Sequence, residues 1–435
     1  MIRKLVKCTF LVTIFSVFMI LGNAVGGAAA QKKITLDFWN TFSLAEIKLL
    51  HEYFNEYETL HPNITITAYE IPHGQRETKV PVAVMTGQTP DILRADYPYQ
   101  YSLAKMGELL ALDDYLKGWE ALEDIYPIMW EDVTYKDRIY AIPQDGFRTV
   151  LYYNKDHFDE AGIKEAPDTW DELVTIGQKL TKDTDGDGKI DQYGFGLHGK
   201  GNDAVSDFMA FLFQAGGAFF RDELSPEKSD GIYTPEDIVV NNEAGKTAIQ
   251  FFVDLVKKYK ISPPGAASHG YGEVNDAFKG GVGSMYLCGS WNIANYEVEV
   301  PHLNYGMAVL PAGPAGYAVP YHACFYEIFK DTKYPKETVD LLKWLVSKEK
   351  ILRWSKELKH MPVRTSVFAN PLFDKPVFKA YKDSVPYQTR QHPKTGRWGA
   401  INKATYTHLA KVLLEEETPE QALDKIAEEI KKTIE

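Results

Sequence analysis

The sequence predicts an α/β protein with two lobes. Its 435 residues, of which 45% are apolar and 25% charged, suffice for two or three folding units with a large core. The chain after residue 30 opens with a strand, a helix and a second strand, and this order predicts a parallel sheet. Strand and helix patterns keep alternating to the C-terminus, so we expect two α/β lobes rather than one.

The first β-α-β unit is predicted from periodicity and capping. Apolar and polar residues alternate over residues 34–39, as they do in a half-buried strand. A helix begins after Ser43, which has the spacing of a capping box with Glu46, and ends before Pro62. Residues 64–67 form the second strand.

The same criteria predict the later elements. Thr169 and Glu172 form a second capping box, and Thr418 caps a final helix with proline at its first position. The further strands are predicted at residues 90–93, 138–143, 150–153, 285–287 and 305–310. The further helices are predicted at residues 102–110, 170–180, 207–214, 244–259, 336–358 and 419–434.

The first 30 residues have the order of a secretory signal. A basic start precedes an apolar stretch at residues 8–21, and three alanines end at Ala30. We expect export to the periplasm or cell surface, with cleavage after Ala30. The alternative is an uncleaved anchor that tethers the protein to the membrane, since the apolar stretch extends towards Val25.

Charge and cysteine content limit the partners. Loss of the signal would change the formal charge from −12 to −15, because it removes Arg3, Lys4 and Lys7. An acidic exported protein lacks the clustered cations that nucleic-acid binding needs, so we expect no nucleic-acid partner. Only Cys288 and Cys324 follow the signal, so one disulfide is possible but no disulfide framework.

An acidic run at residues 183–191, D-T-D-G-D-G-K-I-D, has the spacing of a calcium loop. Its candidate ligands are Asp183, Asp185, Asp187, the carbonyl of Lys189, and Asp191. Position twelve of such a loop should be glutamate, but here it is Gly194. The run is therefore either a structural calcium site or a solvated turn rich in aspartate.

Catalytic motifs are missing. The sequence contains no G-x-S-x-G elbow, no H-E-x-x-H motif, no P-loop and no G-x-G-x-x-G in a β-α-β context. The C-G-S-W run at residues 288–291 matches only part of a papain-type stretch, without the second cysteine. We expect no enzyme and no required cofactor; a glycosidase with paired carboxylates stays an alternative, because the chain has 60 acidic residues.

Three of the tryptophans favour a sugar-binding site. Trp39 ends a predicted strand, while Trp291 and Trp398 follow turns containing glycine. Aromatic rings in such positions can stack on the apolar faces of sugar rings. Each could instead be an ordinary, partly buried surface aromatic.

Short motifs in a fixed order extend nearly from end to end. They lie at residues 36–39, 61–64, 87–92, 107–112, 140–143, 152–155, 161–163, 167–173, 289–291, 310–311 and 361–364. Together they resemble the extracellular solute-binding proteins of family 1, the carbohydrate receptors of ABC importers that include maltose-binding protein. The acidic loop belongs to this resemblance.

The resemblance implies a fold. This is the type II periplasmic-binding-protein fold, in which a hinge joins two α/β lobes and ligand binds in the cleft between them. The N-terminal lobe would hold residues 31–146 and 303–358, and the C-terminal lobe residues 147–302 and 359–435.

The resemblance also implies a function. The protein would be a monomer that binds a di- or oligosaccharide and delivers it to a membrane permease. The alternative ligand is a glycerol phosphodiester or polyol.

The resemblance assigns ligand contacts to seven residues, namely Trp39, Asp96, Tyr97, Gln144, Trp291, Arg364 and Trp398. The three tryptophans would stack on sugar rings, Asp96 and Gln144 would bond hydroxyls, and Arg364 would donate several hydrogen bonds. Asp96 could instead cap a helix, and Arg364 could instead form an ion pair that bridges the lobes.

Overall fold

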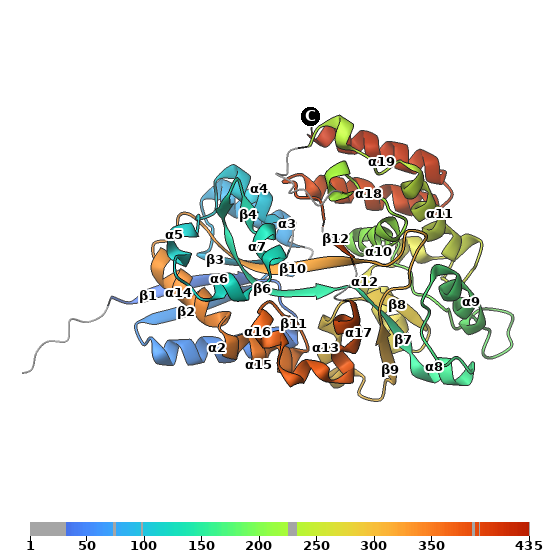
Figure 1. Cartoon of the computed structure of the whole chain (residues 1–435), viewed down its shortest axis with the longest axis horizontal. Helices are drawn as coiled ribbons and strands as arrows, with labels where there is room; N and C mark the ends of the chain where they lie inside the picture. Colours follow the sequence, from blue (N-terminus) through green and yellow to red (C-terminus); the bar gives the residue numbers. More distant parts are fainter. Residues whose placement is uncertain are drawn as a thin grey trace, which may run out of the picture.

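The computed structural model of the chain describes residues 32–434, except residues 73–74, 97–98, 225–232, 385–387 and 391. The expected signal at residues 1–30 and the expected ligand contact Tyr97 therefore lie outside the described residues. Helices surround one main sheet in each of two lobes, and the long strands β6 (Ala141–Arg148) and β10 (Ala318–Ile328) run between the lobes (Figure 1).

The first lobe is built on the larger sheet, with strand order β11-β6-β10-β3-β1-β2. β1 (Ile34–Asn40) pairs in parallel with β2 (Ile64–Glu70) and with β3 (Ile92–Asp96), as the β-α-β pattern predicts. The connecting helices are α2 (Leu44–Leu60) and α3 (Arg76–Thr86). The predicted capping box is present at the start of α2, where the Glu46 carboxylate accepts a hydrogen bond of 2.6 Å from the Ser43 backbone N–H.

Short elements complete this lobe, namely α4 (Tyr99–Met106), α5 (Asp113–Leu116), α6 (Ala121–Asp124), α7 (Pro127–Asp132), β4 (Thr134–Tyr135) and β5 (Arg138–Ile139). The single helix expected at residues 336–358 is two helices, α14 (Pro335–Leu345) and α15 (Lys348–Leu358). Ser347 causes the break, because it takes the extended backbone of an N-cap residue (φ −61°, ψ 157°).

Three connections join the lobes. β6 continues through Thr149 into β7 (Val150–Asn154) of the second lobe. β10 belongs to both lobes, because its beginning pairs with β12 (Gln388–Arg390) and its end pairs with β3. The third connection contains β11 (Met361–Pro362), α16 (Thr365–Phe368), η5 (Pro371–Asp374) and α17 (Pro376–Ser384).

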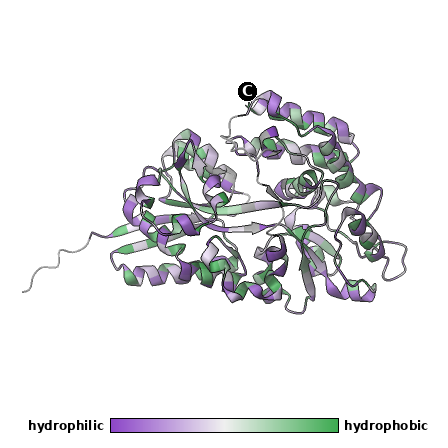
Figure 2. Ribbon diagram, viewed as in Figure 1, coloured by the Kyte–Doolittle hydropathy of each residue, from purple (hydrophilic) through white to green (hydrophobic). Residues whose placement is uncertain are grey.

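The second lobe is built on the three-stranded sheet β8-β7-β9. β7 pairs antiparallel with both β8 (Met285–Cys288) and β9 (Tyr305–Ala308). Its helices are α8 (Lys155–Glu160), α9 (Trp170–Leu180), α10 (Gly201–Gln214), α11 (Glu243–Lys257), α12 (Tyr271–Lys279), α13 (Trp291–Glu299), α18 (Trp398–Leu413) and α19 (Pro419–Ile434), with short turns η2 (Arg221–Leu224), η3 (Pro235–Asp237) and η4 (Ala266–Ser268). Figure 2 shows apolar residues along the strands of both lobes and hydrophilic residues on the outer helices.

The expected lobe boundaries need correction at both later crossings. β9 pairs with β7, and Leu310 packs in the core of the second lobe, so residues 305–310 belong to the second lobe rather than the first. Val363, Val367 and Phe373 pack in the core of the first lobe, so this part of the third connection belongs to the first lobe. Apolar burial, which sequence order does not reveal, decides both assignments.

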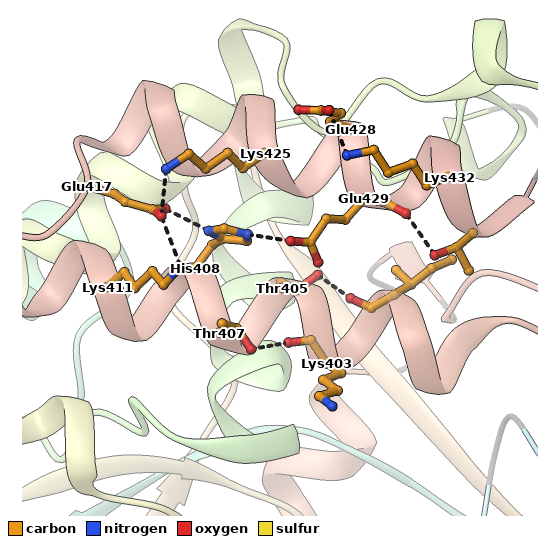
Figure 3. A network of polar contacts seen from close by, with 12 residues as sticks. Lys403, Thr405, Thr407, His408, Lys411, Glu417, Lys425, Glu428, Glu429 and Lys432 are labelled. Atoms are coloured by element: carbon orange, nitrogen blue, oxygen red, sulfur yellow. Dashed lines mark hydrogen bonds and ion pairs between the residues drawn. The ribbon is translucent and has the colours of Figure 1, made fainter.

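A buried ionic network fastens the C-terminal helix α19 to α18 (Figure 3). His408 of α18 is 3% exposed and lies 2.7 Å from a Glu417 carboxylate oxygen through Nδ1 and 3.1 Å from Glu429 through Nε2. Lys425 binds the other oxygen of Glu417 at 2.8 Å, and Lys411 lies 3.3 Å from it. The end of the chain is therefore held by charge as well as by apolar packing.

Two further expectations concern cysteines and membranes. Cys288 and Cys324 are buried thiols in different sheets and form no disulfide with one another. Among the described residues, no helix has the length and apolar character needed to cross a membrane.

Candidate functional site

The lobes touch where α4 of the first lobe meets the segment before α18 of the second. The hydroxyl of Ser102 donates a hydrogen bond of 2.6 Å to the carbonyl of Gly396. Ser102 follows β3, where Asp96 is the last strand residue, and Gly396 precedes Trp398 by two residues. The fold thus brings the neighbourhoods of two expected ligand contacts, Asp96 and Trp398, to the same face between the lobes.

Trp291 is the first residue of α13 and is held in a fixed orientation. Its indole N–H donates to the hydroxyl of Tyr271 at 3.0 Å, and this hydroxyl donates to the side chain of Asn292. The ring lies against the backbone at Gly289, where a Cβ would fall 1.8 Å from a ring carbon. Burial raises the pKa of Tyr271, so this phenol stays protonated and can donate. The half-buried indole is therefore fixed in one orientation.

Trp39 is half-buried at the end of β1 in the first lobe. Its ring packs 5.6 Å from Tyr69 on the adjacent strand β2. It also contacts a small apolar cluster that contains Leu93 and Ala95. This position leaves part of the indole accessible.

Gln144 of β6 is 2% exposed and is engaged inside the first lobe. Its amide donates to Asp145 at 3.1 Å, and its oxygen lies 3.4 Å from the Nε of Arg94. Arg94 also donates to Thr41 at 3.1 Å and lies over the Phe42 ring at 4.4 Å. Gln144 therefore orders the loop after β1 in this structure rather than facing solvent.

The expected ligand contact by Arg364 needs correction. This side chain is fully buried, and its guanidinium donates to Glu120 and Asp124, each at 3.1 Å, and to the Val346 carbonyl at 2.7 Å. Partial burial raises the pKa of Asp124, but hydrogen bonds from Ser366 and Arg364 outweigh that effect and hold it well below its usual range. The ion-pair alternative is the better description, although the pair ties the third connection to α6 within the first lobe.

Trp398 is also more deeply placed than expected. Only 5% of it is exposed, and its ring makes edge contacts with Phe219 at 5.5 Å and His392 at 5.0 Å between centroids. It packs in the core of the second lobe at the start of α18. Trp398 therefore anchors this helix in this structure and offers little surface for stacking.

The amide of Asn402, missed by the sequence analysis, lies one turn along α18 from Trp398 and donates to Asn202 in the first turn of α10. The spacing from Trp398 was the only available signal. Ser102 and Gly396 carried no signal, because their contact joins residues 294 positions apart.

The acidic loop folds as three converging carboxylates. Ligand oxygens of Asp183, Asp185 and Asp191 lie within 4.8 Å of one another. Asp183 accepts backbone hydrogen bonds of 2.6 and 2.7 Å from Gly186 and Gly188, and these bonds lower its pKa. Backbone and side-chain bonds from Thr184 lower the pKa of Asp191.

The other two candidate ligands of this loop interact with each other. Asp187 accepts a hydrogen bond of 2.8 Å from the Lys189 backbone N–H, and its other oxygen lies 3.2 Å from the Lys189 ammonium. Three oxygen donors in one place suit Ca²⁺, which prefers hard oxygen ligands, although a complete shell needs more. The loop follows α9, at the outer side of the second lobe (Figure 1).

A second group of potential metal ligands, Glu46, Asp145 and His360, is buried in the first lobe. His360 Nδ1 lies 2.7 Å from Asp145, and its Nε2 lies 3.8 Å from Glu46. Glu46 already caps α2, and the Trp354 indole donates to Asp145 at 3.3 Å. These side chains therefore form a hydrogen-bonded structural cluster rather than an open metal site.

Comparison with known proteins agrees with this architecture. The family model described as bacterial extracellular solute-binding protein matches residues 43–350. An arabinooligosaccharide-binding protein of Bacillus subtilis is 26% identical over 481 aligned positions that span 99% of both chains. A maltotriose-binding protein of Pyrococcus abyssi is 23% identical over 84% of this chain and 75% of its own.

A solved structure supports the same fold. The solute-binding protein of an ABC transporter from Thermotoga lettingae, bound with α-D-tagatose, superposes with a TM-score of 0.83. It is 26% identical and covers 93% of this chain and 100% of its own. The expected two-lobed type II fold is thereby confirmed.

Proposed function

The chain belongs to the bacterial extracellular solute-binding proteins, and from this premise we propose that it is the exported sugar receptor of an ABC importer. It would bind a di- or oligosaccharide between its lobes as a monomer and present it to the membrane permease. The observation that carries the proposal is the held orientation of Trp291, a half-buried indole whose N–H is bonded to Tyr271.

The proposed mechanism uses the hinge. β6 and β10 pass between the lobes as paired strands, so rotation about them can open and close the interlobe face without unfolding either core. A sugar that contacts both lobes binds the closed form more tightly than the open form and shifts the population towards it. The permease would then recognise the closed arrangement.

The ligand contacts that we propose combine stacking with hydrogen bonds. Trp291 would supply the main stacking surface from the second lobe, and Trp39 a second one from the first. Asp96, Tyr97 and Gln144 stay proposed contacts of the first lobe, with Gln144 needing to release its bond to Asp145. Asn202 and Asn402, as neutral amides, would offer donors and acceptors to sugar hydroxyls.

The alternatives are less well supported. A phosphodiester ligand needs cations, and Arg364, the one cation among the expected ligand contacts, is buried in an ion pair. A polyol would use the same neutral contacts as a sugar, so it belongs in any ligand screen. The sequence motifs and the similar binding proteins give no support to a glycosidase, and we propose that the chain has no enzymatic activity.

We also propose that the acidic loop holds a structural calcium ion through Asp183, Asp185 and Asp191, with the Lys189 carbonyl and Asp187 as further donors if the loop adjusts. No other cofactor is proposed. The loop lies apart from Trp291 in the sequence and fold, so the ion would act on stability rather than on sugar binding.

A ligand screen by calorimetry and thermal shift tests the proposal. The panel contains tagatose, maltose, maltotriose, arabinotriose, mannitol and glycerophosphocholine, each incubated with the mature protein. We expect one or more saccharides to bind with 1:1 stoichiometry and to be recovered uncleaved. Binding of glycerophosphocholine alone, cleavage of an oligosaccharide, or no response to any saccharide would overturn the proposal.

A further inference from the structure

We infer that Ser102 and Gly396 form the contact that ends lobe closure, so that this pair sets how long a bound sugar is retained. The inference rests on the proposed function, because retention has meaning only for a receptor that closes on a ligand. The inference is drawn from a direct contact between the lobes, in which the Ser102 hydroxyl donates a hydrogen bond of 2.6 Å to the Gly396 carbonyl. We call the two residues the closure contact.

The first-lobe side of the closure contact is rigid. Ser102 lies within α4 beside Tyr101, which is 4% exposed, and Leu103, which is also 4% exposed. The Tyr101 hydroxyl donates to the Glu131 carbonyl at 3.3 Å. α4 is therefore held by the first-lobe core, and a force on Ser102 is transmitted to that lobe.

The second-lobe side is a tight turn fixed at both ends. Before Gly396, the Lys394 backbone N–H donates to the Tyr233 hydroxyl at 3.1 Å, and Tyr233 stacks on Phe220 at 3.8 Å. After it, the Trp398 backbone N–H donates to the Thr395 carbonyl at 3.2 Å, and Trp398 is buried in the core. The Gly396 carbonyl is therefore presented to α4 by a structure that cannot easily move on its own.

The absence of a side chain at residue 396 permits the approach. A Cβ there would lie 3.3 Å from the Cα of Ser102 and 3.4 Å from its Oγ, which is closer than most such contacts in proteins. The φ angle of Gly396 is not among the positive values, so glycine is needed here for room rather than for conformation. A branched side chain such as valine at this position would press against α4 and act as a wedge between the lobes.

Closure also brings two phenols together. Tyr233 of the second lobe accepts a hydrogen bond of 3.1 Å from Lys394, two residues before Gly396, and Tyr101 precedes Ser102 in α4. Burial, then Asp132, and then Tyr233 raise the pKa of Tyr101. Two interlobe relationships thus share one location, close in the chain to the end of β3. A contact at this place closes one end of the interlobe face only when the lobes have come together.

The closure contact affects the ligand through the open–closed equilibrium. Removing an interaction that exists only in the closed form lowers the closed population and speeds ligand escape. A neutral hydrogen bond of this kind contributes little in absolute terms, so Ser102→Ala should speed sugar dissociation roughly two- to tenfold. Gly396→Val should have a larger effect, because it adds repulsion, and we expect dissociation to be more than about tenfold faster.

A first experiment reads closure without any sugar. Ser102→Cys with Gly396→Cys is oxidised in the mature protein, since a Cβ at residue 396 would lie 3.3 Å from the Cα of Ser102 and the two thiols would be within reach of a disulfide. We expect a disulfide in the double variant and none in either single variant, whose native cysteines are buried. No cross-link in the double variant would overturn the closure contact, whether or not any sugar binds.

A second experiment measures the effect of the closure contact on sugar retention. Stopped-flow dissociation of maltotriose, or of whichever panel sugar binds, is compared for wild type, Ser102→Ala, Gly396→Val and the control Gly272→Val. Gly272 is exposed in α12, and a Cβ there meets nothing within 4 Å. Unchanged rates in both closure variants would overturn the inference, and faster release in the control as well would do the same.

Small-angle scattering of the free proteins separates the possible failures. We expect Gly396→Val to have a larger radius of gyration than wild type, and the oxidised double cysteine variant to have the smallest. If no panel sugar binds but the cross-link and scattering behave as expected, the ligand class is wrong and the closure contact stands. If sugar binds normally and Gly396→Val scatters like wild type, the closure contact is wrong and the function stands.

Discussion

His360 Nδ1 lies 2.7 Å from a carboxylate oxygen of Asp145, and both side chains are buried. The contact joins the start of the third connection to β6, which is one of the strands of the hinge. Burial lowers the pKa of His360, but hydrogen bonding and attraction to Asp145 outweigh burial and raise it. Asp145 is affected in the opposite direction, since His360 and Arg94 lower its pKa despite burial.

The signs of these shifts predict a stability maximum at mildly acidic pH. The His360 contribution is complete below its unfolded pKa of about 6.5 and is lost as the pH rises through the higher folded value. The Asp145 contribution is complete above its unfolded pKa of about 3.8 and is lost as the pH falls through the lower folded value. Between these limits both contributions are present.

The substitution His360→Gln tests this prediction. It should reduce the free energy of unfolding by about 3 kcal/mol near pH 5.5, because it leaves a buried carboxylate without its cation. Urea unfolding from pH 4 to pH 9 should show the difference from wild type shrinking at alkaline pH. A difference that grows with pH would contradict the assignment.

The network of Figure 3 predicts a second dependence of stability on acid pH, through Glu417. Burial raises its pKa, but bonds from Lys425, His408 and Lys411 lower it to about 2. A lowered carboxylate pKa stabilises the fold above the unfolded value of about 4.5, and the effect is lost as the pH falls towards 2. Glu417→Gln should therefore lower the unfolding free energy by about 3 kcal/mol at pH 7 and have little effect near pH 2.

The control for this variant is Glu428→Gln. Glu428 pairs with Lys432 at 2.7 Å, but 62% of its side chain is exposed. A solvent-exposed pair of this kind contributes little, so the control should unfold like wild type. Equal destabilisation by both substitutions would show that burial of the network is not the cause.

The sequence predicted these features unevenly. Local signals succeeded, as for the capping box of Ser43 and Glu46 and for the N-cap Thr169, whose hydroxyl accepts a bond of 3.2 Å from the Glu172 N–H. The Glu172 carboxylate accepts from the Asp168 N–H instead of that of Thr169, so the second box is only half formed. The strand β10 escaped prediction because it is buried on both faces and shows no alternation. Ser347 is the N-cap of a new helix inside a stretch whose apolar residues keep helical spacing, so the sequence pattern did not reveal the break.

The candidate site was harder to predict than the fold. Residue type alone did not show that Arg364 would be paired with Asp124 and Glu120, nor that Trp398 would be buried. Burial and partners depend on contacts between distant segments, which one sequence does not reveal. Packing between these segments decides which of the expected side chains are buried.

Arg364 gives a prediction that separates structure from ligand binding. Arg364→Met should lower the unfolding free energy by about 3 kcal/mol, because Asp124 is only 12% exposed and loses its main cation. Sugar affinity, measured by calorimetry well below the unfolding temperature, should change less than about threefold. The control Lys348→Met removes an exposed partner 3.7 Å from Asp124 and should do little to either quantity.

Trp291 gives the complementary prediction. Trp291→Ala should weaken sugar binding about tenfold or more while leaving the unfolding midpoint nearly unchanged, because it removes a stacking surface from a half-buried position. Tyr271→Phe should weaken binding by a smaller factor, since the ring stays but its 3.0 Å anchor is lost. The control is Trp344→Phe. Trp344 lies in the first-lobe helix α14, with its ring centroid 5.2 Å from that of Tyr57, so its substitution should affect stability alone. Unaltered affinity in Trp291→Ala would remove Trp291 from the site.

The acidic loop predicts a calcium effect that is confined to stability. Three carboxylates with oxygens within 4.8 Å of one another repel unless a cation lies between them, so Ca²⁺ should raise the unfolding temperature of the chelator-treated protein. Asp183→Asn should abolish this rise, because Asp183 contributes one of the three carboxylates. The control Asp171→Asn changes an exposed carboxylate in the first turn of α9 and should keep the full calcium response. Sugar affinity should be the same with Ca²⁺ and with chelator, because the loop and Trp291 lie in different parts of the second lobe. If chelator lowered both the unfolding temperature and the sugar affinity, the effect of calcium would not be confined to stability.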